Sequence, residues 1–286
     1  MSTTADSLTT QAPPRLIVNV ASGPGLGRKV VLSPGDELRI GRAPQADLCV
    51  PDDPEMAGHH LALSATDQGH KLRDLGSVTG TWLDGQRVEE ADVPHASWVR
   101  AGSTELLLYH EGWAGSRAAE PDETRGLCEH KARALEELRR SGSLYAVLDA
   151  ARDGWVLTLL RESIDEMCCL FDPPEAQTLF RVAPFAVRLS AESKLLDHLV
   201  RLGWGRSWGI YLEHDRPFAR LREHLRLVLN SSNPETGAPA YFRFYDPRVL
   251  RVHAPQCSVA QRDRLFGPIR CFFAEGEDGA LQRFDR

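Results

Sequence analysis

The sequence predicts a multidomain chain in which an all-β sandwich over residues 15–110 is followed by an α/β domain with a mixed sheet over residues 143–286. The first part consists of short apolar runs separated by turn clusters rich in Gly, Asp and Pro, the pattern of a β-sandwich. The second part alternates strand-like runs with segments in which apolar residues recur at helical spacing. Between them, residues 111–142 start with the polar stretch EGWAGSRAAEPDETRG, which is typical of a linker.

The composition is that of a globular protein, with 42% apolar and 26% charged residues in a chain of 286. Residues 1–14 have neither a basic start nor an apolar core and are expected to form a disordered tail. No segment is apolar over the roughly 20 residues that a membrane helix needs. The six cysteines lack zinc-binding spacing and several lie in apolar runs, which predicts a reduced, cytoplasmic protein without a metal site.

The charge distribution argues against nucleic acid as the main partner. Residues 1–115 carry nine basic and fifteen acidic side chains, and residues 141–286 carry nineteen of each. Neither part has the net basic character that binding to a phosphate backbone requires. A Walker A loop and a dinucleotide-binding fingerprint are also absent from the sequence, so no cofactor is expected.

The strands expected in the first part are short runs rich in β-branched and apolar residues. They are separated by the turn clusters SPGD, DQG, GSVTG and DGQ. In chain order the runs are RLIVNV, RKVVLS, ELRIG, DLCV, HLALSA, HKLRDL, TWLDG and STELLLYH.

The linker is expected to lead into a helix, CEHKARALEELRR, with a weak apolar stripe through Leu135 and Leu138. The strands expected after it are short and strongly apolar or aromatic. They are LYAVLDAA, MCCLF, FAVRLS, WGIYLEH, YFRFYD and RCFFAEG.

Three further helices are expected in the second part. Residues 191–202 carry leucines at helical spacing, with Ser190 as the N-terminal cap and Gly203 in the left-handed closing position. Residues 217–229 form the next helix, with Pro217 at its first position. A capping box of Ser258 and Gln261 starts a helix that ends at Gly267-Pro268.

Three loops of the first part carry a distinctive set of residues: Gly41-Arg42, Ala57-Gly58-His59-His60 and the segment DLGSVTGTWLDG from Asp74 to Gly85. Together they resemble the forkhead-associated (FHA) domain, a β-sandwich whose loop tips bind phosphothreonine peptides. The resemblance covers about residues 15–110. It implies that Arg42 meets the phosphate, which suits the fork of donors on a guanidinium. It also implies that His60 braces the loops and that Gly80-Thr81 shapes the turn into the next strand.

The first part departs from the FHA pattern at three positions. Ala57 replaces the serine that binds phosphate in the family, and Gly58 replaces the basic residue after it. Thr79 replaces the asparagine that holds the peptide backbone. Arg42 and Ser77 remain of the phosphopeptide-type residues, so phosphate binding and a purely structural docking face both stay open for this domain.

The second part contains one motif that invites a catalytic interpretation. Gly205-Arg206-Ser207-Trp208-Gly209 matches G-x-S-x-G, and Asp215 or Asp246, then His253, follow in the order of a serine hydrolase. The motif requires a strand, a tight turn and then a helix, whereas here a helix ends at Gly203 and a strand begins near Trp208. The Asp246-Pro247 pair also has the form of a helix start. The sequence therefore favours a protein that is not an enzyme.

Arginine and aromatic residues are concentrated in two other stretches, GWGRSWGIYLEHD and YFRFYDPRVLR. Trp and Arg are enriched at protein interfaces, although alternate aromatic residues of a strand also face a core. A working surface for binding partners is expected at Trp204, Arg206, Trp208, Tyr245, Asp246 and Arg248.

The strings LYAVLDAARD, CCLF, APFAVRL, LGWGRSWGIYL, YFRFYDPRVL and LFGPIRCFF also resemble, in this order, the domain of unknown function carried by type VI secretion adaptor-chaperones. The resemblance spans about residues 143–275. It implies a cytoplasmic bacterial adaptor that binds a toxic effector and helps to load it onto the VgrG spike. Many family members continue with a helical lobe, which is expected to be missing or very short here. A phosphothreonine-reading scaffold and a serine hydrolase centred on Ser207 are the alternatives.

Overall fold

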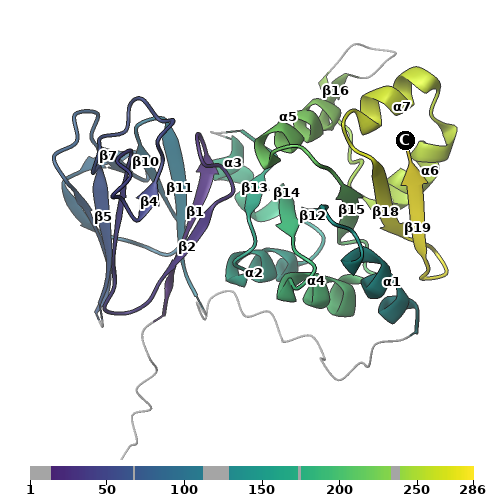
Figure 1. The fold of residues 1–286 in the computed structure, drawn as a ribbon, viewed down its shortest axis with the longest axis horizontal. Coiled ribbons are helices and arrows are strands. Elements are labelled where there is room, and N and C mark those ends of the chain that lie inside the picture. The colour runs from purple at the N-terminus through teal and green to yellow at the C-terminus, as the bar shows by residue number, and fades with distance from the viewer. Residues whose placement is uncertain (1–13, 67, 112–128, 173–174, 233–238) are drawn as a thin grey trace, which may run out of the picture.

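The computed structural model describes residues 14–66, 68–111, 129–172, 175–232 and 239–286. Residues 1–13 of the expected tail and residues 112–128 of the expected linker lie outside the described residues. The described chain contains a β-sandwich followed by an α/β domain, which confirms the predicted fold class (Figure 1).

The N-terminal sandwich consists of two sheets that pack face to face around a leucine- and valine-rich core. One sheet has the order β2-β1-β11-β10-β7-β8, and the other has the order β4-β3-β5-β6-β9. The first sheet comprises β1 (Leu16–Ser22), β2 (Lys29–Leu32), β7 (Thr81–Leu83), β8 (Gln86–Val88), β10 (Ser97–Ala101) and β11 (Thr104–His110). The second comprises β3 (Glu37–Gly41), β4 (Leu48–Cys49), β5 (Leu61–Thr66), β6 (Gly69–Asp74) and β9 (Glu90–Asp92).

The C-terminal domain is built on a six-stranded sheet with the order β13-β14-β12-β15-β18-β19. Its neighbouring strands all pair antiparallel, whereas the sequence predicted a mixed sheet. Strands β12 and β14 are connected through β13 and helices rather than by a parallel crossover. The strands are β12 (Leu144–Asp149), β13 (Met167–Cys169), β14 (Pro184–Leu189), β15 (Gly209–Glu213), β18 (Cys271–Glu275) and β19 (Leu281–Asp285).

Helices cover both faces of this sheet (Figure 1). One face packs against α1 (Glu129–Arg139), α2 (Gly154–Glu162), α4 (Lys194–His198) and the π-helical turn η3 (Leu199–Gly203). The other packs against α5 (Phe218–Leu229), α6 (Pro247–Gln256) and α7 (Val259–Phe266). The remaining elements are α3 (Glu175–Leu179), the 3-10 turn η2 (Phe180–Val182), β16 (Asn230–Ser232) and β17 (Pro239–Tyr241).

Several expected elements differ from the observed ones. YFRFYD is not a strand, because only its first residue belongs to β17 and Asp246 already caps α6. The cap of α4 is Ser193 rather than Ser190, because its hydroxyl accepts a hydrogen bond from the backbone N–H of Leu196. The capping box of Ser258 and Gln261 is present as expected. Helices α2 and α3 and strand β19 were not expected from the sequence.

The two domains share a continuous apolar junction. Ile17, Leu107 and Tyr109 on the outer face of the β1–β11 sheet belong to the same buried cluster as Val156 and Leu160 of α2. The ring of Trp98 also meets that of Phe180 edge to face, with centroids 5.8 Å apart. Burial of this much apolar surface favours a fixed arrangement of the domains.

The β1–β2 loop of the sandwich covers the edge strand β13 of the C-terminal sheet. The backbone N–H of Met167 donates to the carbonyl oxygen of Gly27 at 3.2 Å, so the edge strand gains a partner from the other domain. Gly27 has φ +88°, and a Cβ there would lie 2.8 Å from the Phe218 ring. Only glycine allows the loop to approach this closely.

Lys29 makes a polar contact across the junction. Its Nζ donates to the carbonyl oxygens of Leu160 and Ser163, at 2.6 and 2.8 Å, where α2 ends. Burial lowers the pKa of this ammonium group to about 7, although the nearby Asp165 carboxylate opposes the shift. The junction therefore favours the neutral form of Lys29 relative to the unfolded chain.

This difference predicts a pH-dependent stability. Between pH 7 and 10.5 the unfolded chain holds the Lys29 proton more tightly than the folded chain. The free energy of unfolding should therefore rise with pH across this window, by up to about 1.4 kcal/mol per pH unit from this group. Urea denaturation of the wild type and of Lys29→Met at about pH 7 and about pH 9 measures it. The rise should be smaller in Lys29→Met and unchanged in the exposed control Lys71→Met. Equal pH slopes in wild type and Lys29→Met would contradict it.

Candidate functional site

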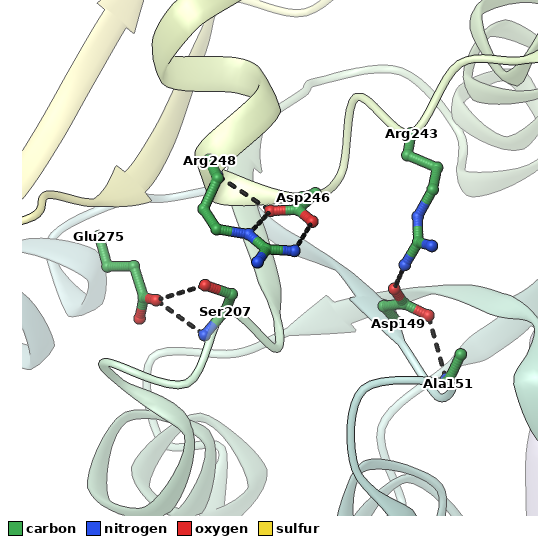
Figure 2. A network of polar contacts seen from close by, with 7 residues as sticks. All are labelled: Asp149, Ala151, Ser207, Arg243, Asp246, Arg248 and Glu275. Carbon is green, nitrogen blue, oxygen red and sulfur yellow. Dashed lines mark hydrogen bonds and ion pairs between the residues drawn. The ribbon is translucent and has the colours of Figure 1, made fainter.

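One edge of the C-terminal sheet gathers most of the polar side chains of the two arginine- and aromatic-rich stretches. Strands β12 and β18 end at this edge with Asp149 and Glu275, and β15 begins there after Ser207 and Trp208. The N-terminus of α6, capped by Asp246, lies against the same edge (Figure 2). We call this cluster the polar edge: Asp149, Asp246 and Glu275 with Arg206, Arg243, Arg248 and Ser207.

Glu275 fixes the loop between η3 and β15. Its buried carboxylate accepts hydrogen bonds from the backbone N–H groups of Gly205 and Ser207, the latter at 2.8 Å. The hydroxyl of Ser207 donates to the same carboxylate at 3.3 Å (Figure 2). Ser207 has φ 55°, an uncommon conformation for a residue with a side chain, and these hydrogen bonds hold it there.

Asp246 caps α6 and binds the arginine two residues later. Its carboxylate accepts from the backbone N–H of Arg248 at 3.0 Å and from Nε and Nη2 of the same residue at 2.9 and 2.6 Å. Burial of Asp246 opposes its ionisation, but the hydrogen bonds from Arg248 outweigh this effect and lower its pKa. The carboxylate therefore stays charged and holds the guanidinium in a bidentate pair.

Asp149, at the end of β12, also binds both a backbone N–H group and an arginine. Its carboxylate accepts from the backbone N–H of Ala151 at 3.0 Å and forms an ion pair with Arg243 (Figure 2). The guanidinium of Arg243 also lies over the ring of Tyr245, 5.8 Å from its centroid. Burial and the Asp149 carboxylate raise the pKa of Tyr245 to about 12, so its phenol is neutral at physiological pH.

The aromatic members of the expected surface are buried, which corrects the sequence prediction. Trp204, Trp208 and Tyr245 are 7%, 3% and 5% exposed, and Asp246 is 4% exposed. The ring of Trp208 fills the space left by the missing side chain of Gly203, and the indole N–H of Trp204 donates to the carbonyl oxygen of Gly279 at 2.8 Å. Trp204 and Trp208 belong to the buried cluster on one face of the sheet, and Tyr245 belongs to the cluster on the other face.

The two arginines of the expected surface are exposed. Arg206 and Arg248 have side-chain exposures of 46% and 53%. The sequence prediction missed Arg243, Asp149 and Glu275. The signal available in the sequence was an acidic residue at the end of an apolar strand, because a carboxylate that is buried there needs a cationic or N–H partner.

The residues of the hydrolase alternative do not form a triad in the described structure. The Ser207 hydroxyl is bound to Glu275, whereas Asp215 pairs with Arg270 and Asp246 pairs with Arg248. The ring of His253 packs against Phe242 with centroids 4.7 Å apart. Ser207 follows helical turn η3 and precedes strand β15, the reverse of the order that a nucleophile elbow requires.

In the sandwich, His60 holds the three motif loops together. Its Nδ1 accepts from the backbone N–H of Ala57 at 3.1 Å, so Nε2 carries the proton and lies 3.3 Å from the carbonyl oxygen of Gly80. The first loop is joined as well, because the N–H of Arg42 donates to the carbonyl oxygen of Ala57 at 2.9 Å. A Cβ at Gly41 would clash with the Gly58 carbonyl, which explains the glycine.

The motif side chains of these loops differ in their orientation. Arg42 is exposed, and no ion-pair partner for it occurs among the described residues. Ser77 is buried and donates its hydroxyl to Asp74 at 2.8 Å. Thr79 is exposed, but its hydroxyl donates to the carbonyl oxygen of Glu55 at 3.1 Å. Of the phosphopeptide-type residues, Arg42 is therefore the one whose charged group faces solvent.

Comparisons with known proteins describe each half of the chain. Solved structures similar to the N-terminal half include the Rv1747 FHA-1 domain of Mycobacterium tuberculosis, at 27% identity over 35% of this chain and 98% of that one, with a TM-score of 0.31. The CT664 FHA domain of Chlamydia trachomatis is 26% identical over 33% of this chain and 96% of that one, also with a TM-score of 0.31. Residues 144–264 match the family model of the domain of unknown function DUF4123. After these similarities we refer to the N-terminal domain as the FHA half and to the C-terminal domain as the DUF4123 domain.

Two sequence matches concern the FHA half. Residues 19–112 match a family model described as the cytoplasmic domain of an inner membrane component of T3SS. The ABC transporter ATP-binding/permease protein Rv1747 of M. tuberculosis is 32% identical over 99 residues, which are 35% of this chain. The match spans only 11% of the length of that transporter.

None of the helices in the described part of the chain is long and apolar enough to cross a lipid bilayer. Within the same residues, no group of three or more His, Cys, Asp or Glu side chains is arranged to hold a metal ion. The five cysteines described are all free thiols, and Cys128 lies outside the described residues.

The burial of Trp208 predicts its role in stability. Trp208→Ala should lower the free energy of unfolding by about 3–5 kcal/mol, because it leaves a cavity in the core of the DUF4123 domain. Arg206→Ala, on the same loop but exposed, should cost less than about 1 kcal/mol. Urea denaturation compares the two variants, and an unchanged stability of Trp208→Ala would contradict the core assignment.

Proposed function

We propose that this protein is a non-catalytic adaptor-chaperone of a bacterial type VI secretion system. It binds a secreted effector, the VgrG spike, or both, in the cytoplasm, and promotes loading of the effector onto the spike. The observation that carries the proposal is the DUF4123 match over residues 144–264 in a chain whose arginine-rich motifs form an ordered, exposed polar edge.

The proposed division of labour follows the two folds. Residues 15–110 form the FHA module, residues 111–142 connect it to the second domain, and residues 143–286 form the adaptor domain. The polar edge is the proposed binding surface. Its exposed side chains include Arg206 and Arg248, and the buried residues that support the surface are Trp204, Trp208, Tyr245 and Asp246. Partners are proteins, because neither domain has an excess of basic side chains.

Secretion by the native host tests this function. Deletion of the chain should abolish secretion of its effector while the spike itself is still secreted. Purification of the tagged chain should recover the effector, the spike, or both, identified by mass spectrometry. Normal effector secretion after deletion, or recovery of neither protein, would contradict the proposal.

Phosphothreonine binding by the FHA half is the second candidate function, and the exposed Arg42 favours it. The loops around Arg42 are held in place by His60, so one phosphate-binding group is positioned. Ala57 offers no hydroxyl, and the Thr79 hydroxyl is engaged by Glu55. A phosphothreonine protein is therefore a partner only if other contacts replace these two.

The unmodified FHA half should accordingly bind phosphothreonine peptides weakly. Each hydrogen bond to a charged group contributes about 1.5–3 kcal/mol, or about ten- to a hundredfold in dissociation constant. Ala57→Ser with Thr79→Asn should tighten binding, and adding Arg42→Ala to that double variant should abolish the gain. Calorimetry on the full chain with a phosphothreonine peptide library measures this. Tight, phosphate-dependent binding by the wild type would contradict the expectation.

A further inference from the structure

The polar edge arranges its charges in two layers. The side chains of Arg206, Arg243 and Arg248 are 46%, 48% and 53% exposed. The side chains of their acidic partners, Asp153, Asp149 and Asp246, are 25%, 2% and 4% exposed. An approaching molecule therefore meets cationic groups first, although with the buried Glu275 the carboxylates outnumber these arginines by four to three.

Each guanidinium is also held in position before any partner binds. Arg206 lies over the Trp208 ring, 6.0 Å from its centroid, and Arg243 lies over Tyr245 in the same way. Arg248 is fixed by the bidentate contact with Asp246. Side chains that are already ordered lose little rotamer entropy on binding, so their contacts contribute more to affinity.

The arginines retain donors for a second acceptor. A guanidinium has five N–H donors, and Asp246 takes the Nε and Nη2 groups of Arg248. Within the described residues, Nη1 of Arg248 has no hydrogen-bond partner, and Figure 2 shows the outer side of this guanidinium away from Asp246. This free edge matches the planar, two-oxygen geometry of a carboxylate.

We propose that Arg206, Arg243 and Arg248 form a docking surface for a glutamate- or aspartate-rich segment of a partner protein. The inference deepens the proposed adaptor function, since it names the chemistry that the partner presents. A carboxylate of a peptide binds to one guanidinium group at a time, through short hydrogen bonds. A nucleic acid needs a broad net-positive stripe, which three arginines beside four carboxylates do not supply.

Fluorescence anisotropy with the purified full chain tests the surface. The probes are a fluorescein-labelled peptide rich in Glu and a matched peptide in which every Glu is Gln. The Glu peptide should bind the wild type, more weakly as salt rises, and the Gln peptide should bind at least about tenfold more weakly.

Three variants assign the binding to these arginines. Arg206→Gln should weaken binding of the Glu peptide about tenfold or more, since one charge-assisted contact is lost. Arg243→Lys keeps a positive charge beside the buried Asp149, so the fold is retained while the planar fork is lost, and binding should again weaken. Arg270→Gln is the matched control, because Arg270 pairs with Asp215 at the opposite edge of the same sheet and is 61% exposed. It should bind like the wild type.

The outcomes distinguish a failure of the docking surface from a failure of the proposed adaptor function. Equal binding of the two peptides, no binding of the Glu peptide, or wild-type binding by Arg206→Gln would overturn the docking surface. Tighter, arginine-dependent binding of labelled single-stranded DNA would overturn it as well, in favour of a nucleic-acid site. Effector secretion in the host tests the adaptor function independently, so either result can fail while the other holds.

Discussion

The organisation of the DUF4123 domain depends on one constraint: a carboxylate that is removed from water must be paired or hydrogen-bonded. The antiparallel sheet brings Asp149 and Glu275 to one edge, and the start of α6 adds Asp246 there. Each of the three is buried and each is satisfied by neighbouring N–H groups or guanidinium groups. The same contacts that satisfy these charges fix the loop before β15, the first turn of α6 and the end of β12.

A second constraint joins the two halves of the molecule. Strand β13 is an edge strand, and an exposed edge invites pairing with other chains. The sandwich covers it through the carbonyl of Gly27, while Lys29 satisfies the carbonyl groups at the end of α2. The FHA half therefore satisfies backbone groups of the DUF4123 domain. The two domains also share one buried apolar cluster.

Sequence reasoning predicted the fold class and singled out Arg206 and Arg248, but it missed Arg243 and the burial of the aromatic residues. Local signals such as the Ser258–Gln261 capping box and the Asp246-Pro247 start depend on neighbouring residues and were readable. The residues of YFRFYD favour a strand, but in the structure they lead into α6, so tertiary context overrides the local strand propensity. Burial of Trp208 depends on its packing over Gly203 and on a large apolar cluster drawn from distant parts of the chain, which no local pattern encodes. The role of Glu275, sixty-eight residues from Ser207, is non-local in the same way.

Arg42 and the arginines of the polar edge differ in whether a carboxylate pairs with the guanidinium group. Arg42 extends from the sandwich without an ion pair among the described residues, so its full charge acts on a ligand but its side chain must be ordered on binding. The arginines of the polar edge are already ordered, but the buried carboxylates offset part of their charge. The first arrangement suits one strongly charged group such as a phosphate, provided other contacts hold the ligand. The second suits several weaker charges presented together, because shape and donor geometry then contribute as much as net charge.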